Sequence, residues 1–258
     1  MESDIWILVP LSILLGLMVG SFSNVVIHRL PRGESVAWPA SHCPACGHDI
    51  AWYDNIPVVS YLLLRGRCRH CRTAISGRYP LAEVAMGVTW GYLAWHFGWH
   101  PQLAMAMALA TALWVLTWID LETGLLPDAI TLPGVAIGLG FSFWFGHGPD
   151  GIIGAVAGYG IFWLVAKIFL RITGREGMGY GDFKLLAMLG AFLGWQALPL
   201  IILLASVSGA VIGSLYLLLS RSQMQNPIPF GPYLALAGMI WLLWGPEWMH
   251  WYVGMMTR

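Results

Sequence analysis

Charged residues are scarce in this sequence, and their scarcity excludes an ordinary soluble domain. Asp, Glu, Lys and Arg make up only 10% of the 258 residues, whereas about a quarter is usual in a soluble protein. Hydrophobic residues reach 58%, and the mean hydropathy is +0.68. The apolar residues form long continuous runs and lack the short alternating segments of a membrane β-barrel. We therefore expect an all-α polytopic membrane protein.

The features of a cleavable signal peptide are missing as well. The first residues, MESD, are acidic where a signal peptide has a positively charged segment, and no small-x-small cleavage site closes the first apolar run. We therefore interpret residues 5–27 as a helix that the protein retains.

Long apolar runs predict about eight transmembrane helices, because a helix needs about 20 apolar residues to cross a bilayer. The expected spans are 5–27, 80–97, 102–119, 130–146, 151–170, 183–196, 198–219 and 229–245. This pattern divides the chain into a first transmembrane helix at 1–27, a cytoplasmic loop at 28–79 and a membrane-embedded core at 80–258.

Basic residues gather on one face of this topology. Of the 13 Lys and Arg residues, 12 fall on that face and Arg258 falls on the other. The 12 are Arg29, Arg32, Arg65, Arg67, Arg69, Arg72, Arg78, Lys167, Arg171, Arg175, Lys184 and Arg221. The positive-inside rule makes the richer face cytoplasmic. Both termini are then expected on the outer side.

All four cysteines lie in the loop at 28–79, as CPAC at 43–46 and CRHC at 68–71. Two CxxC pairs 21 residues apart are typical of a four-thiolate zinc site. Disulfides or free thiols are the alternatives, but a cytoplasmic position argues against disulfides. Four cysteine ligands leave no open position on the ion, so we expect Cys43, Cys46, Cys68 and Cys71 to hold a structural zinc.

The same loop carries arginines beside aromatic residues, and this combination could bind a nucleic acid. A loop tethered to a membrane is better placed to present or clamp a protein substrate. We therefore expect no nucleic-acid partner. His42, His48 and His70 lie near the cysteines, and we interpret them as solvated or supporting residues rather than ligands.

Two carboxylates stand at ends of apolar spans on the predicted cytoplasmic boundary. Asp120 closes the run TALWVLTWID, and Asp182 opens the sixth span. Ionisable residues at membrane depth are costly and mark functional sites. Two carboxylates on neighbouring helices can share a proton, which is the arrangement of aspartic proteases. The alternatives are an interfacial Asp120 and an Asp182 that caps its helix while Lys184 reaches the headgroups.

Glycines at 177, 179 and 181 alternate up to Asp182. Because glycine has no Cβ, an extended substrate backbone could approach closely here. A glycine-rich loop before a helix can instead bind phosphate, but no strand precedes this one and no GK[ST] follows.

These motifs together resemble the bacterial type IV prepilin peptidases, which are bifunctional leader peptidases and N-methyltransferases. The resemblance covers nearly the whole chain. It is carried by GSFSNVVIHRLP at 20–31, CPACGHDIAWYDNIPVVSYLLLRGRCRHC at 43–71, ISGRYPLAE at 75–83, WIDLETGLLPD at 118–128 and GMGYGDFK at 177–184. Glu122 departs conservatively from the aspartate that family members often have there.

The resemblance implies a membrane aspartic protease of the GxGD type in the bacterial inner membrane, with Asp120 and Asp182 as the catalytic pair and Asp128 as a rival for the first position. Implied substrates are prepilins or type II secretion pseudopilins, cut on the cytoplasmic face between glycine and phenylalanine after a short basic leader. S-adenosylmethionine would then methylate the new N-terminus, and membrane lipid would surround the helices.

Further substrate contacts are expected at Gly179, Gly181, Lys184, Glu83 and Asp128. Glu83 could hold the amine of the cut product or an arginine. Two other classes of function stay open at this point. One is a proton- or ion-coupled transporter, although the acids lie at one interface and not at the midplane. The other is a non-catalytic scaffold for pilus or secretion assembly.

Overall fold

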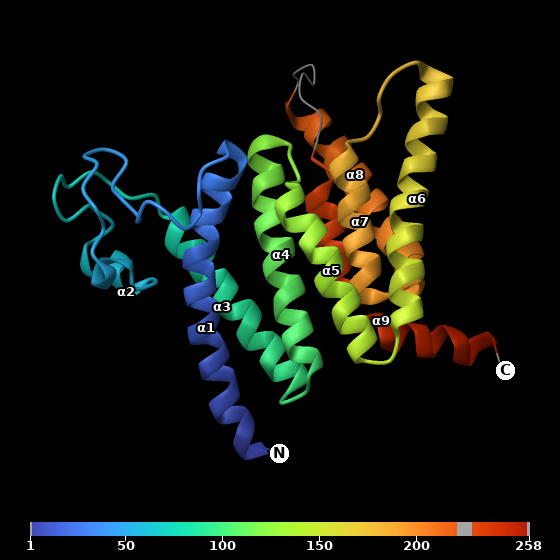
Figure 1. Ribbon diagram of the computed structural model, residues 1–258, viewed down its shortest axis with the longest axis horizontal. Coiled ribbons are helices and arrows are strands. Elements are labelled where there is room, and N and C mark those ends of the chain that lie inside the picture. The colour runs from blue at the N-terminus through green and yellow to red at the C-terminus, as the bar shows by residue number, and fades with distance from the viewer. Residues whose placement is uncertain (1, 221–228, 257–258) are drawn as a thin grey trace. The chain divides into compact units, whose positions relative to one another are not determined.

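The structure is a computed structural model that describes residues 2–220 and 229–256 (Figure 1). Arg221 and Arg258, which enter the charge argument for orientation, lie outside the described residues. The described part is helical and contains no strand. Its helices are α1 (Glu2–Arg29), α2 (Val59–Leu63), α3 (Arg78–Phe97), α4 (Gln102–Thr123), α5 (Asp128–Trp144), α6 (Gly148–Thr173), α7 (Tyr180–Leu193), α8 (Leu198–Ser220) and α9 (Gly231–Met256).

Eight of the helices in the described part coincide with the eight predicted spans, and the ninth, α2, is a five-residue helix inside the predicted loop. Among the residues that the structure describes, four segments are long and apolar enough to cross a membrane, namely 5–32, 102–123, 148–173 and 195–215. The all-α membrane fold is therefore confirmed, while the number of crossings stays a prediction.

The chain forms two compact units, Met1–Val115 and Leu116–Arg258, and the division falls within α4. The predicted division into a first helix, a loop and a membrane core follows membrane position instead, and it stays a prediction. Both predicted catalytic aspartates belong to the second unit. The cysteines and Glu83 belong to the first.

In the first unit, α1 packs closely against α3. A Cβ atom on Gly16 would lie 2.9 Å from the Cα of Gly87, and one on Gly20 would lie 2.8 Å from the Cα of Glu83. Small residues allow helix backbones to approach in a membrane, where packing rather than hydrophobicity holds helices together. The same principle applies in the second unit, where Gly154 of α6 faces Gly190 of α7.

Both α6 and α7 end at a glycine with positive φ. Gly174 has φ +69° and donates its N–H to the carbonyl of Leu170, which terminates α6. Gly194 has φ +81° and donates to Gly190, which terminates α7. Glycine adopts this left-handed region without the steric cost that a Cβ brings.

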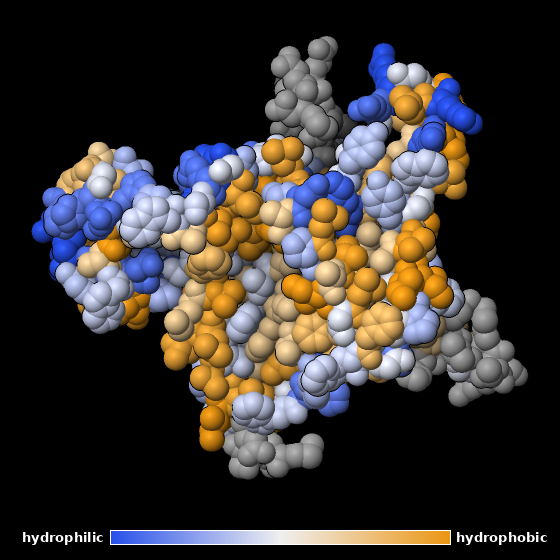
Figure 2. Space-filling model, viewed as in Figure 1, coloured by the Kyte–Doolittle hydropathy of each residue, from blue (hydrophilic) through white to orange (hydrophobic). Residues whose placement is uncertain are grey.

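Large apolar side chains are exposed along the long helices, as lipid-facing surfaces require. On α1 they include Ile7, Leu11, Leu14 and Leu15, and on α6 they include Val156, Leu164 and Val165. Figure 2 shows hydrophobic surface along α1 and hydrophilic surface over the loop that contains α2. This distribution fits a multi-pass protein with a polar loop outside the bilayer.

Candidate active site and metal centre

The ends of several helices in the second unit meet around the predicted catalytic residues. Asp120 lies in the last turn of α4, and Asp182 lies in the first turn of α7. The first residue of α9, Gly231, contacts Asp120 directly, and the first residue of α5, Asp128, pairs with Lys184 of α7. Segments that are far apart in sequence therefore form one site.

Asp120 is buried, with 5% of its surface exposed. Its Oδ2 atom accepts a hydrogen bond from the backbone N–H of Gly231 at 2.9 Å. The first N–H groups of a helix have no partner within that helix. The carboxylate of α4 thus satisfies a free donor at the start of α9.

Asp182 is also buried, with 9% exposed. It is the third residue of α7, whose N-cap is Gly179. The backbone of Gly179 hydrogen-bonds the Asp182 carboxylate, so the side chain reaches back to the N-cap as the acid of a capping box does. The N-cap position considered for Asp182 is therefore occupied by Gly179, and Asp182 lies inside the first turn.

The two buried aspartates lie close enough that the charge of Asp120 acts on Asp182. Two neighbouring carboxylates disfavour double ionisation, and such an arrangement can share one proton. A shared proton provides an acid and a base at neighbouring positions, which is what hydrolysis of a peptide bond by water requires.

Asp128, the rival for the first catalytic position, lies in a different environment. It is exposed, and its Oδ1 atom lies 2.6 Å from Nζ of Lys184. Through this ion pair Lys184 joins the start of α7 to the start of α5. The substrate contacts predicted for Lys184 and Asp128 stay predictions. Asp128 and Lys184 therefore form a partner pair of their own beside the buried aspartates.

The four cysteines converge in the first unit. Their sulfur atoms all lie within 4.8 Å of one another, and Sγ of Cys43 lies 3.8 Å from Sγ of Cys71. Tetrahedral coordination with metal–sulfur bonds of about 2.3 Å requires sulfurs roughly 3.8 Å apart. A hydrogen bond with the Thr73 hydroxyl lowers the pKa of the Cys71 thiol to about 6, while burial and the neighbouring sulfurs of Cys71 and Cys43 raise the pKa of Cys46 to about 11. The cluster can hold a metal ion.

The two cysteine pairs are built alike. The N–H of the residue after each pair donates to the carbonyl of the pair's first cysteine, from Gly47 to Cys43 and from Arg72 to Cys68. Both donors have positive φ, +68° and +62°. Such a turn folds each pair back on itself and directs both of its sulfurs to one side.

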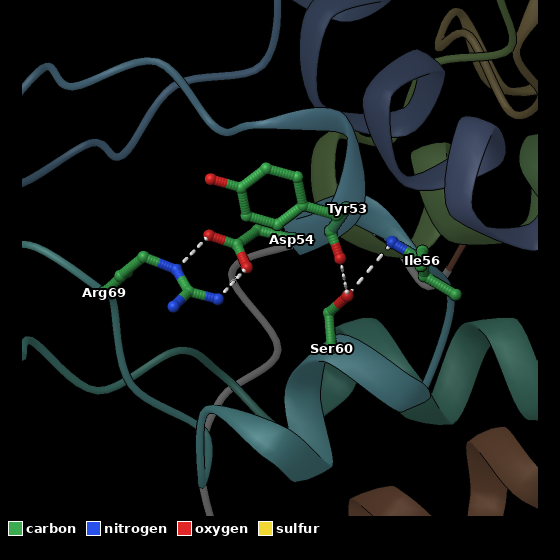
Figure 3. A network of polar contacts seen from close by, with 5 residues as sticks. All are labelled: Tyr53, Asp54, Ile56, Ser60 and Arg69. Atoms are coloured by element: carbon green, nitrogen blue, oxygen red, sulfur yellow. Dashed lines mark hydrogen bonds and ion pairs between the residues drawn. The ribbon is translucent and has the colours of Figure 1, made fainter.

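A polar network fastens the second cysteine pair to the rest of the loop (Figure 3). Arg69 donates to both carboxylate oxygens of Asp54, at 2.6 and 2.5 Å, and this contact lowers the pKa of Asp54. Next to it, Ser60 of α2 donates to the carbonyl of Tyr53 and accepts from the N–H of Ile56. The loop is thus an ordered module.

Comparison with known proteins agrees with this arrangement. Residues 107–214 match the model of the type IV leader peptidase family, and residues 14–97 match that of the bacterial peptidase A24 N-terminal domain. The chain is 47% identical to a prepilin leader peptidase/N-methyltransferase of Pseudomonas aeruginosa, over 92% of this chain and 90% of the relative. This chain belongs to the type IV leader peptidase family.

Other members of the family are similarly close. The prepilin leader peptidase/N-methyltransferase of Stutzerimonas stutzeri is 46% identical over 92% of this chain and 90% of its own length. That of Aeromonas salmonicida is 46% identical over 96% of this chain and 94% of its own length. No solved structure matches the chain.

The glycines before Asp182 differ from one another in this family member. A Cβ on Gly181 would lie 2.8 Å from Cβ of Leu126, and one on Gly177 would lie 2.5 Å from the ring of Phe169. Two of the three glycines therefore make room for the protein's own side chains. A Cβ on Gly179 would instead make an ordinary contact, 3.7 Å from Oδ2 of Asp182, so of the three it best fits the predicted approach of a substrate backbone.

Glu83 stabilises a turn of the loop in the first unit. It is buried, accepts the N–H of Val58 at 2.7 Å and hydrogen-bonds Ser21. Val58 has φ +62°, and the N–H of Val59 donates to the carbonyl of Pro57, which is a strained γ-turn. Glu83 holds this turn against α3. The substrate contact that we predicted for Glu83 stays a prediction.

Gly231 is the residue of this site that sequence reasoning missed. Its signal is the sequence FGP at 230–232, directly before an apolar run. A glycine and a proline at a helix start are common, however, and nothing local shows that this start lies against Asp120. Only the contact across 111 residues of sequence reveals it.

Proposed function

We propose that this protein is a membrane aspartic endopeptidase that removes the leader of prepilins or type II secretion pseudopilins and then methylates the new N-terminus. The burial of Asp120 and Asp182 at one site, where the charge of Asp120 acts on Asp182, carries this proposal. The names of the relatives, prepilin leader peptidase/N-methyltransferase, support both activities.

In the proposed mechanism the pair holds one proton. The ionised aspartate takes a proton from water, and the water oxygen attacks the carbonyl carbon of the glycine before the cut. At the same time the other aspartate gives its proton to that carbonyl oxygen. The tetrahedral intermediate then collapses: one of its hydroxyl groups returns a proton to the ionised aspartate, the C–N bond breaks, and the leaving amine takes the proton of the other aspartate, so that the pair again holds one proton. Burial of both acids strengthens these electrostatic interactions.

The methyl donor implied by the family is S-adenosylmethionine, whose positively charged sulfur would supply an activated methyl group. The protein's own contribution is to release the new N-terminal amine near the membrane surface. We place the cut and the loop at 28–79 on the cytoplasmic face of the inner membrane, and both termini on the periplasmic face. The distribution of basic residues supports this orientation.

We further propose that Cys43, Cys46, Cys68 and Cys71 hold zinc. The separation of the sulfurs fits a tetrahedral ion, and four thiolates suit zinc in a structural role. Membrane lipid would cover the exposed apolar helix faces, and we expect no nucleic-acid partner. Metal analysis of the purified protein, with and without serine at the four cysteines, tests the zinc assignment.

Cleavage of a prepilin by purified protein tests the catalytic pair. Asp120→Asn and Asp182→Asn should each abolish cleavage, because an asparagine side chain can neither take a proton from water nor share one with the remaining aspartate. Asp128→Asn is the matched control, since it makes the same change at an exposed acid of the same unit. Mass spectrometry of the product detects the added methyl group.

Full activity in Asp120→Asn or Asp182→Asn would refute the pair. The peptidase chemistry would then lie elsewhere in the protein, whereas an absence of cleavage by the wild type itself would favour the transporter and scaffold alternatives. A lost activity in Asp128→Asn with retained activity in Asp120→Asn would move the first catalytic position to Asp128.

A further inference from the structure

We infer that Gly231 is a positioning residue for catalysis, because its backbone N–H fixes the orientation of Asp120. This inference rests on the proposed peptidase function. The start of α9 would then be a third part of the active site, beside the end of α4 and the start of α7. Gly231 contributes a backbone N–H donor, and because it has no side chain it leaves room for the carboxylate of Asp120.

The first step of the argument is the position of Asp120 in its own helix. Asp120 lies three residues before α4 ends at Thr123. The carbonyl groups at a helix C-terminus carry partial negative charge, which disfavours a carboxylate there. A buried carboxylate in this position therefore needs a donor from elsewhere.

The N-terminus of α9 supplies that donor. Its partial positive charge suits a carboxylate, and the Gly231 N–H lies 2.9 Å from Oδ2 of Asp120. Pro232 has no N–H, and the N–H groups of Tyr233 and Leu234 already donate to the carbonyl of Phe230. The first turn of α9 therefore directs the amide of Gly231, and not its neighbours, to Asp120.

The second step is that position 231 has no room for a side chain. A Cβ there would lie 2.6 Å from Oδ2 and 3.2 Å from Cγ of Asp120, and 3.3 Å from Cδ2 of Leu126. Leu126 also fills the space beside Gly181. A methyl group at 231 would push the carboxylate of Asp120 away from its place or move α9.

Aromatic packing holds the start of α9 in place. The ring of Phe230 lies 6.1 Å from that of Phe162 in α6 and 6.3 Å from that of Tyr233. A donor on an anchored backbone keeps one oxygen of Asp120 fixed. The other oxygen is then left for water or for the partner acid, as a proton-sharing pair needs.

The test compares Gly231→Ala with Gly160→Ala in the full-length protein in detergent. Gly160 lies in α6, and a Cβ there would meet no atom within 4 Å. Misplacing a reacting group by about 1 Å costs roughly 100-fold in rate. We expect kcat of Gly231→Ala to fall about 100-fold with KM nearly unchanged. Gly160→Ala should keep the wild-type kcat and melt at or slightly above the wild-type temperature, and Gly231→Ala should melt only slightly below it.

A second measurement reports on Asp120 without using peptidase activity. Carboxyl groups are labelled with a carbodiimide and glycine ethyl ester, and mass spectrometry follows the rate at Asp120, with exposed Glu122 on the same helix as an internal standard. We expect the Asp120 rate, relative to Glu122, to rise in Gly231→Ala and not in Gly160→Ala.

The two measurements separate the possible failures. A changed labelling rate without cleavage by any form of the protein would support the positioning of Asp120 and refute the peptidase. An active Gly231→Ala with kcat within threefold of Gly160→Ala would overturn the inference. So would a loss of kcat that is accompanied by a melting temperature far below that of the control, because the loss would then come from folding.

Discussion

The close contact between α6 and α7 predicts that a single methyl group on α6 will disturb the candidate active site. Gly154 of α6 faces the backbone of α7, and a Cβ at this position would lie 2.3 Å from the carbonyl oxygen of Gly190. It would also lie 2.8 Å from the carbonyl carbon of Gly190 and 2.9 Å from that of Gly194. The perturbation is therefore Gly154→Ala.

The size of the effect follows from these distances. Contacts of a Cβ below 3.0 Å are essentially never found, so α6 and α7 would have to separate by roughly 0.7 Å. Overpacking of this kind costs about 1–3 kcal/mol of unfolding free energy. Because the obstructing atoms are backbone, no side-chain rotation can relieve the contact. The helix that moves, α7, carries Asp182 in its first turn, and a shift approaching 1 Å there should lower kcat at least about tenfold.

The matched control lies on the same helix. Gly160→Ala introduces the same methyl group into open space, and it should stabilise α6 by up to about 1 kcal/mol through helix propensity alone. Thermal unfolding in detergent, followed by tryptophan fluorescence, and prepilin cleavage compare the two variants. If Gly154→Ala melts no lower than Gly160→Ala and cleaves at the same rate, the close packing of α6 on α7 does not hold Asp182 in place.

Two further predictions concern the ion pair and the metal. Asp128→Lys and Lys184→Asp should each destabilise the protein by less than about 1 kcal/mol, because the pair is partly exposed, and the double exchange should restore stability. Thermal unfolding in a double-mutant cycle measures this coupling, and purely additive effects would contradict a direct pair. Removal of metal with a chelator should make the loop at 28–79 sensitive to trypsin, because a structural ion contributes to the folding of its site. Identical digestion patterns with and without the chelator would show that metal does not order the loop.

Much of the architecture could be predicted from local sequence. Long apolar runs predict helices wherever they occur, because a chain in a bilayer must satisfy its backbone hydrogen bonds within each segment. The eight predicted spans and eight helices of the described part therefore agree within a few residues, except that α9 ends at Met256 and not near residue 245. The two CxxC pairs likewise predicted a cluster, since the turn after each pair depends only on its neighbours.

The sequence by itself thus determined the class of protein, the helices and the cysteine cluster, and it indicated which aspartates are candidates for catalysis. Tertiary structure alone decided which groups meet. It placed Gly231 against Asp120, Lys184 against Asp128, and Leu126 beside Gly181. It also placed the carboxylate of Glu83 where it accepts the N–H of Val58 in the γ-turn. The physical reason is the same for each, because these contacts join residues far apart along the chain and depend on how whole helices pack, which no local pattern records.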